Sequence, residues 1–265
     1  MKKFKLLLML IAVLLVLPTV VDAKVGDIDE DGFEVINQTD KYYKTVTIYV
    51  NNENSIQGIN SEPTVLSTIT YEISEFEYEN VNINNSSNYI INYQTIIETT
   101  YKHMVTTLNT NGNTFRYKNV LTWRIMPSTR SHDIIGIGFY SSVKPLNNVL
   151  YFNQEYIKNG VAYNSSLCTK QIFSNGASAT FALPGSSDVT DMKQTLYFDV
   201  EKTNPNSTIT SQGIFGDYAH ATSTSTLATA IMHEVVGSLG IVHNLGTASY
   251  YDTMNVAAVY WSGTW

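Results

Sequence analysis

Apolar and polar residues alternate along much of this chain, beginning near residue 44. In residues 44–50, valine and isoleucine side chains fall on one side of an extended backbone, and threonine and tyrosine fall on the other. The same alternation returns at residues 69–73. A period of two is typical of a strand with one buried face, so both segments are predicted strands. After Ile73 the apolar positions shift by one, to Phe76 and Tyr78, which predicts a β-bulge.

The centre of the chain carries a strong hairpin signal. Two strand-like stretches, 90–108 and 115–125, flank the pair Asn111-Gly112, whose residues both tolerate positive φ. Further strand-like runs lie at 134–140, 149–152, 179–183, 196–200 and 259–261. Many short strands separated by Asn, Gly, Ser and Pro predict a mostly β fold, an antiparallel β-sandwich-like arrangement.

One late segment has a helical period instead. Leu227, Ile231, Val235 and Leu239 recur every four residues, and serines and threonines that can cap a helix precede them. This spacing predicts at most one short C-terminal helix, near residues 226–237.

The first 23 residues match the pattern of a cleavable signal peptide. A basic start is followed by the apolar run 6–16 and by small residues ending at Ala23. The alternative is a membrane anchor, but the run is shorter than the roughly 20 residues that span a bilayer, and Pro18 follows it. We therefore predict cleavage after Ala23 and a secreted, extracellular protein.

The rest of the chain divides into an acidic N-terminal segment, 24–42, and a β-rich region, 43–265. The β-rich region forms one large domain, or two that meet at a weak boundary near 127–130. A second apolar run of spanning length is absent from the sequence, so no membrane insertion of the mature chain is expected.

Charge and cysteine content exclude some partners. The full chain has a formal net charge of −7, and residues 1–23, with three lysines and one aspartate, carry part of its positive charge. The mature chain is therefore more acidic still, which argues against nucleic acid as a partner. Cys168 is the only cysteine, so no intrachain disulfide can form and the fold must depend on packing.

Residues 233–243 read His-Glu-Val-Val-Gly-Ser-Leu-Gly-Ile-Val-His. This stretch resembles the metzincin zinc-peptidase signature, His-Glu-x-x-His-x-x-Gly-x-x-His, in which histidines one helical turn apart bind zinc. The resemblance, which covers residues 233–254, implies roles for five residues: His233 and His243 as metal ligands, Glu234 as the catalytic base, Gly240 as the turn and Met254 beneath the metal.

The chain departs from this signature at Gly237, which replaces the second histidine. A catalytic zinc normally keeps three protein ligands, so the motif alone is one short. His132, His220 and Asp252 are conceivable third ligands, and the sequence does not choose among them. The other interpretation is that 231–243 is an ordinary segment of a β-rich fold. On that interpretation no cofactor is expected, and zinc belongs to the alternative.

A second candidate metal site follows the predicted signal peptide. Asp27, Asp29 and Asp31, followed by Gly32, begin like a calcium loop, with carboxylates at alternate positions. The glutamate expected at the twelfth position is Gln38. The other interpretation is an acidic, exposed segment.

Together these patterns predict an exported, extracellular or surface-associated β-rich protein with a non-catalytic binding or structural role and an unknown extracellular ligand. The alternative is a metzincin-like zinc metallopeptidase, intact or degenerate, and the sequence leaves open whether the protein is an enzyme.

Overall fold

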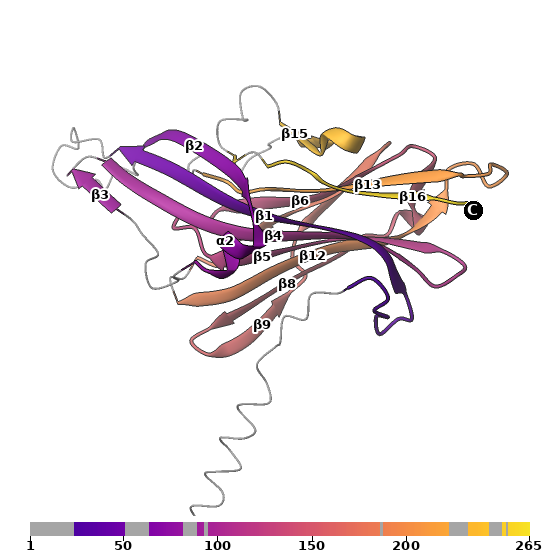
Figure 1. Cartoon of the computed structure of the whole chain (residues 1–265), viewed down its shortest axis with the longest axis horizontal. Coiled ribbons are helices and arrows are strands. Elements are labelled where there is room, and N and C mark those ends of the chain that lie inside the picture. Colours follow the sequence, from indigo (N-terminus) through magenta and orange to yellow (C-terminus); the bar gives the residue numbers. More distant parts are fainter. Residues whose placement is uncertain are drawn as a thin grey trace, which may run out of the picture.

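The computed structural model describes residues 24–50, 64–81, 89–92, 95–185, 188–222, 233–243, 251–252 and 254–265. The predicted signal peptide lies outside these residues. Within them the chain is mostly strand, in two antiparallel sheets that share one core (Figure 1). The predicted mostly β, sandwich-like fold class is confirmed. No helix in the described part of the chain is long and apolar enough to cross a membrane.

The larger sheet has nine strands. They are β1 (Glu34–Val50), β2 (Thr64–Ile73), β3 (Tyr89–Asn92), β4 (Thr95–Thr110), β5 (Phe115–Ile125), β7 (Val143–Pro145), β8 (Tyr151–Lys158), β9 (Val161–Ser165) and β12 (Val189–Lys202). Their order is β2-β1-β4-β5-β12-β8-β9, with β3 paired to β4 and β7 paired to β12. The hairpin predicted at Asn111-Gly112 joins β4 to β5, and Gly112 has a φ of +85°.

The smaller sheet has five strands in the order β10-β11-β6-β13-β16. They are β6 (His132–Phe139), β10 (Thr169–Phe173), β11 (Gly176–Ala182), β13 (Ser211–Ala219) and β16 (Ala257–Ser262). A separate two-stranded hairpin pairs β14 (His233–Val235) with β15 (Ile241–His243). The described helical segments are α2 (Glu75–Glu79) and two 3-10 turns, η2 (Leu146–Asn148) and η3 (Gly237–Leu239).

The alternation of side chains explains how the two sheets share a core. Ile135, Ile137 and Phe139 of β6 are fully buried and belong to the main apolar cluster, together with side chains from both sheets. The intervening Gly136 and Gly138 lie on the outer face of the smaller sheet, beneath the 233–243 hairpin. A period of two therefore places apolar side chains inside and leaves room outside.

Two local predictions are corrected by the structure. Of the helix expected near 226–237, residues 226–232 lie outside the described residues, while 233–235 form strand β14 and 237 begins a 3-10 turn. Gly237 and Gly240 have positive φ values of 44° and 68°, which an α-helix does not permit. The bulge predicted after Ile73 is instead the helix α2, which Ser74 caps by accepting a hydrogen bond from the Glu77 N–H at 3.1 Å.

The predicted divisions of the chain fall inside this architecture. Strand β1 begins at Glu34, so the second half of the acidic segment 24–42 belongs to the larger sheet. Residues 127–130 connect β5 of the larger sheet to β6 of the smaller one. The main core draws side chains from both sides of this connection.

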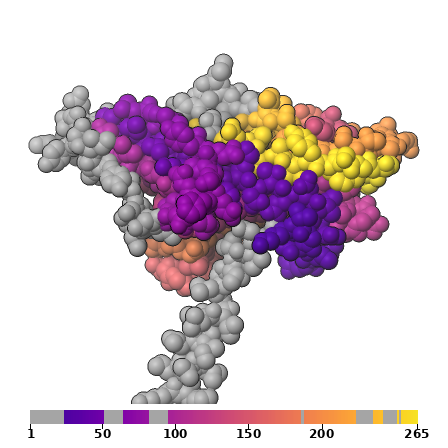
Figure 2. Space-filling model, viewed as in Figure 1, coloured from indigo at the N-terminus to yellow at the C-terminus, as the bar shows by residue number. Residues whose placement is uncertain are grey.

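Side chains of β1 cover the free edge of β16. Asn37 Nδ2 donates to the Tyr260 carbonyl at 2.7 Å, and Thr39 Oγ1 donates to the Ala258 carbonyl at 2.6 Å. Figure 2 shows the N-terminal residues, in indigo and purple, beside the yellow C-terminal segment. An exposed strand edge invites unwanted pairing, and here β1 occupies carbonyls at that edge and joins the two sheets along this side.

A buried asparagine joins the sheets in the interior. Asn119 of β5 donates through Nδ2 to the carbonyls of Gly136 and Asp217, both at 3.1 Å, on two strands of the smaller sheet. Thr106 Oγ1 donates to Asn119 Oδ1 at 3.1 Å. Gly216 makes this approach possible, because a Cβ there would lie 1.9 Å from Thr106 Oγ1.

Replacing Gly216 with alanine should therefore destabilise the fold. We expect Gly216→Ala to lower the free energy of unfolding by about 1–3 kcal/mol, the usual cost of overpacking a core. Gly185→Ala is the matched control, since a Cβ at Gly185 meets nothing within 4 Å, and its effect should stay within about 0.5 kcal/mol. Urea unfolding measures both. Equal effects would contradict the role given to Gly216.

Candidate functional site

The 233–243 hairpin lies directly on the outer face of the smaller sheet. Val235 and Ile241 of this hairpin are buried in a second apolar cluster, with Ile134, Ala219, Ala221 and Tyr251. The glycines below it are required: a Cβ at Gly138 would lie 2.0 Å from the Gly237 carbonyl oxygen. A Cβ at Gly176 would lie 2.4 Å from the carbonyl oxygen of Val235. Glycine therefore allows backbone to pack on backbone here.

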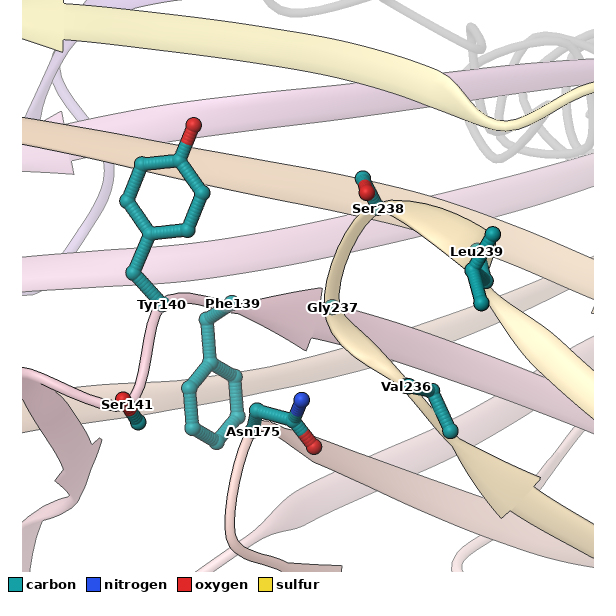
Figure 3. A pocket seen from close by; sticks show the side chains of 8 residues that line it. All are labelled: Phe139, Tyr140, Ser141, Asn175, Val236, Gly237, Ser238 and Leu239. Carbon is teal, nitrogen blue, oxygen red and sulfur yellow. The ribbon is translucent and has the colours of Figure 1, made fainter.

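An open hollow of about 490 Å³ lies beside the turn of this hairpin. It is lined by Phe139, Tyr140, Ser141, Asn175, Val236, Gly237, Ser238 and Leu239. Figure 3 shows the Tyr140 side chain on one side of the hollow and residues 236–239 on the other. The Asn175 carbonyl fixes the two sides, because it accepts from the N–H groups of Phe139 at 2.9 Å and Gly237 at 3.1 Å.

Large side chains at this hollow remain open to solvent. Tyr140 is 42% exposed and Leu239 is 69% exposed. The ring of Tyr140 packs against Phe215 of β13, at 5.8 Å between centroids, and Phe215 packs in turn against Tyr260 of β16. A supported tyrosine ring offers a flat apolar surface and a hydroxyl at modest entropic cost.

The structure brings His233 and His243 to opposite positions of the hairpin. They are register partners in the ladder between β14 and β15, and Glu234 pairs with Val242. Their backbones are paired across a hairpin of two strands, where the metzincin resemblance implies a helix. Gly240 does occupy the turn, with its φ of +68°.

Two of the conceivable third ligands have other partners. His220 and Asp252 are buried and bonded to each other: the His220 N–H donates to Asp252 Oδ1 at 2.8 Å. His132 is at the first position of β6, and Met254 packs against the main core. Among the residues that the structure describes, no group of three or more His, Cys, Asp or Glu side chains could hold a metal ion.

The carboxylates of the candidate calcium loop face an arginine. Asp29 and Asp31 both accept from Nη1 of Arg116, at 3.1 and 2.8 Å, and Asp199 accepts from its Nε at 2.8 Å. Asp27 accepts from the N–H of Lys24 at 2.7 Å. The calcium site stays a prediction, and in the structure a guanidinium neutralises two of its three carboxylates.

A cluster of charged side chains occupies the space between the two sheets. The polar cluster consists of Lys102 on β4, Asp133 on β6, His220 after β13 and Asp252, and each of them is at most 4% exposed. Lys102 Nζ is in direct contact with Asp252 Oδ2. His220 Nδ1 lies 3.0 Å from Asp133 Oδ1, and the hydroxyl of Tyr218 donates to Asp133 Oδ2 at 2.5 Å.

Burial and charge set the titration of two groups near this cluster. Burial lowers the pKa of His220, but the Asp133 carboxylate outweighs it, so the pKa is raised from its usual value. Burial raises the pKa of Asp217 to about 7, although this carboxylate accepts from the N–H groups of Ile241 and Tyr218, both at 2.7 Å. Asp217 therefore ties the 233–243 hairpin to β13, and its carboxyl group titrates near neutral pH.

Comparison with known proteins gives no family. No family model and no curated protein matches the chain. Among solved structures, similarity is found to the collagen-binding domain of a Staphylococcus aureus adhesin, with 8% identity, 56% of this chain and 88% of that chain covered, and a TM-score of 0.26. The RrgB pilus protein of Streptococcus pneumoniae is similar at 7% identity, with 91% of this chain and 55% of that one covered and a TM-score of 0.30. AvmM, which catalyses macrocyclization in alchivemycin A biosynthesis, is similar at 10% identity, with 56% of this chain and 80% of that one covered and a TM-score of 0.29. TM-scores of this size do not assign the chain to any of these families.

Sequence reasoning missed both the hollow and the polar cluster. The hollow combines residues from three separate stretches, 139–141, 175 and 236–239. Lys102 and Asp252 are 150 positions apart. The available signal was a lysine inside an alternating strand pattern, on the same face as Met104, which is fully buried.

Removing the Asp217 carboxylate should flatten the pH dependence of stability. Because its pKa is raised from 3.8 to about 7 by folding, the folded state holds the proton more tightly than the unfolded state. This contribution is present at low pH and is lost as pH rises from about 4 through 7, by at most about 4 kcal/mol. The stability of the wild type relative to Asp217→Asn should fall over that range. Urea unfolding at several pH values measures it, and a constant difference would contradict the assignment.

The zinc motif should not hold metal, even when its missing histidine is restored. We expect no stoichiometric zinc and no chelator-sensitive proteolysis in the wild type, because the motif supplies two histidines and a catalytic zinc needs three ligands. Gly237→His should gain no zinc and should lose about 1–2 kcal/mol of stability, since position 237 has a φ of +44°. Elemental analysis after dialysis and a protease assay measure these outcomes.

The control for Gly237→His is Gly160→His, at a turn with a φ of +74° and open space around it. Both variants should be strained and free of zinc. One zinc per chain in Gly237→His, lost again on His243→Ala, would instead support the metzincin resemblance.

Proposed function

We propose that the protein is a non-catalytic binding protein that acts outside the cytoplasm and takes its ligand in the hollow beside Tyr140 and Leu239. The signal-peptide pattern of residues 1–23 supports export. The observation that carries the binding proposal is the composition of the hollow. Its lining combines exposed apolar side chains with hydroxyl and amide groups, and none of its eight residues is Asp, Glu, His, Lys, Arg or Cys.

The acidic and basic side chains of the polar cluster do not line the hollow. Asp133, His220 and Asp252 are between the sheets, where each is at most 4% exposed and bonded to a neighbour. A general acid or base must reach its substrate to within hydrogen-bond distance. In this arrangement these groups stabilise the fold, whereas the hollow offers contact surface and hydrogen bonds.

The lining also suggests the chemistry of the ligand. Tyr140 offers a ring face supported by Phe215, and Ser141, Asn175 and Ser238 offer neutral hydrogen-bonding groups around it. A saccharide matches this combination, because it presents C–H faces for stacking and hydroxyls for hydrogen bonds. We propose a neutral glycan as the ligand class.

The metallopeptidase alternative has one observation in its favour, the register that pairs His233 with His243. A second ligand pair or a third ligand is required for a catalytic zinc, and Gly237 offers no side chain. We therefore place the binding function ahead of the metallopeptidase.

Removing the exposed ring should abolish most of the binding. We expect Tyr140→Ala to weaken glycan binding about tenfold or more, because buried tyrosine anchors commonly contribute 2 kcal/mol or more to an interface. A glycan array with the purified protein finds the ligand, and calorimetry with the wild type and the variant measures the change.

Tyr151→Ala is the matched control, because Tyr151 is 47% exposed and stacks on Tyr197 of the larger sheet, away from the hollow. This variant should bind as the wild type does. Absence of binding to every neutral glycan, or equal losses in the two variants, would show that the hollow is not a glycan site.

A further inference from the structure

The lysine and the aspartate at the centre of the polar cluster are completely enclosed. The side chains of Lys102 and Asp252 are both 0% exposed, and Lys102 Nζ is in direct contact with Asp252 Oδ2. In the other lysine–carboxylate pairs of the described residues, every side chain is at least 20% exposed. Among the lysine–carboxylate pairs of the described residues, Lys102 and Asp252 are therefore the one pair that is completely buried.

The surroundings fix the geometry of this pair. The Asp252 carboxyl accepts the backbone N–H of His220 at Oδ1, 2.8 Å away, while the Asp252 N–H donates to the His220 carbonyl at 3.0 Å. Lys102 Nζ lies 5.1 Å from the centre of the Trp123 ring, whose Nε1 donates to Tyr218. Both reacting groups are thus held by backbone bonds and by packing, with little freedom to separate.

Enclosure makes the ionic form of the pair costly. Two charges removed from water lose their hydration, and attraction between them repays this loss only in part. Condensation of the amine with the carboxyl would remove both charges and release one water molecule from a site that excludes water. Groups held in contact also react as though at very high concentration.

We propose that Lys102 and Asp252 form an intramolecular amide bond, a covalent link between Nζ of Lys102 and Cγ of Asp252. The uncharged amine attacks Cγ, the new C–N bond forms, and one C–O bond of the carboxyl breaks. Overall, an ammonium and a carboxylate give one amide and one water, so that charge, protons and electrons balance without any oxidant or cofactor.

Neighbouring groups are placed to assist this step. The His220 N–H, bonded to Asp252 Oδ1, can stabilise the negative oxygen of the tetrahedral intermediate. The carboxyl of Asp133 and the ring of His220, 3.0 Å apart, form a buried pair that can accept and return protons next to Asp252. Asp133 acts on the reaction through His220 and is therefore a positioning residue.

The amide bond would connect the two sheets. Lys102 is in the middle of β4, in the larger sheet, and Asp252 precedes β16, the edge strand of the smaller sheet. The bond would close a loop of about 150 residues and join the two sheets covalently. It supplies to this chain, which has a single cysteine, the kind of restraint that disulfides give other exported proteins.

Intact mass spectrometry of the purified full chain, with its N-terminus sequenced, tests the proposal. We expect a mass lower than that of the sequence by one water molecule, and a branched peptide containing Lys102 and Asp252 after proteolysis. Lys102→Arg keeps the positive charge but cannot form the bond, so it should have its full sequence mass. Its Tm should fall by about 10–20 °C, the loss expected for opening a loop of this length.

Two further variants separate the covalent bond from an ordinary salt bridge. Lys41→Arg alters an exposed pair with Glu72, with side chains 20% and 41% exposed, and should keep the mass deficit. Asp252→Asn should give the same amide by losing ammonia instead of water. A wild type with its full sequence mass and no branched peptide would overturn the proposal, as would a mass deficit that persists in Lys102→Arg. The wild-type measurement is decisive even where a variant fails to fold.

Discussion

The requirement that every buried charge has a partner organises this sandwich. Lys102, Asp133, His220 and Asp252 lie between two sheets that otherwise pack apolar side chains, and each of them contacts another member of the cluster. A buried charge without a partner in this place would strongly lower the free energy of unfolding. The Asp252 side chain must therefore reach the polar cluster between the sheets. The bridge between Ala221 and Tyr251, next to the paired hydrogen bonds of His220 and Asp252, holds this residue in place.

The second constraint is the row of small residues on the outer face of the smaller sheet. Gly136, Gly138 and Gly176 leave three positions of this face without side chains, so the 233–243 hairpin can approach the backbone there and bury Val235 and Ile241. The turn of the hairpin then stands beside Tyr140, and the space between them is the hollow. The candidate binding site is thus a consequence of how the hairpin is seated, and not of a catalytic motif.

The sequence predicted those features that depend on neighbours along the chain. The period of two identified the strands, and Asn111-Gly112 identified the turn between β4 and β5, because both signals are local. The helix prediction failed at residues 233–237, where apolar residues spaced four apart had indicated a helix. Val235 is indeed buried, but against the outer face of a sheet, and the glycines at 237 and 240 turn the chain back. The contact between Lys102 and Asp252 depends on the closing of the sandwich, so no local pattern could reveal it.

Strand β13 connects the interior to the candidate site, because successive residues point to opposite faces of a sheet. Tyr218 points inward and donates to Asp133 of the polar cluster, whereas Asp217 points outward and accepts from Ile241 of the hairpin. Phe215, on the same outer face as Asp217, supports the ring of Tyr140. The same strand therefore contacts both the polar cluster, through Tyr218, and the Tyr140 ring beside the hollow, through Phe215. A tyrosine ring held by such a strand loses little conformational freedom when a ligand binds, and preorganisation of this kind favours recognition by a shallow, uncharged site.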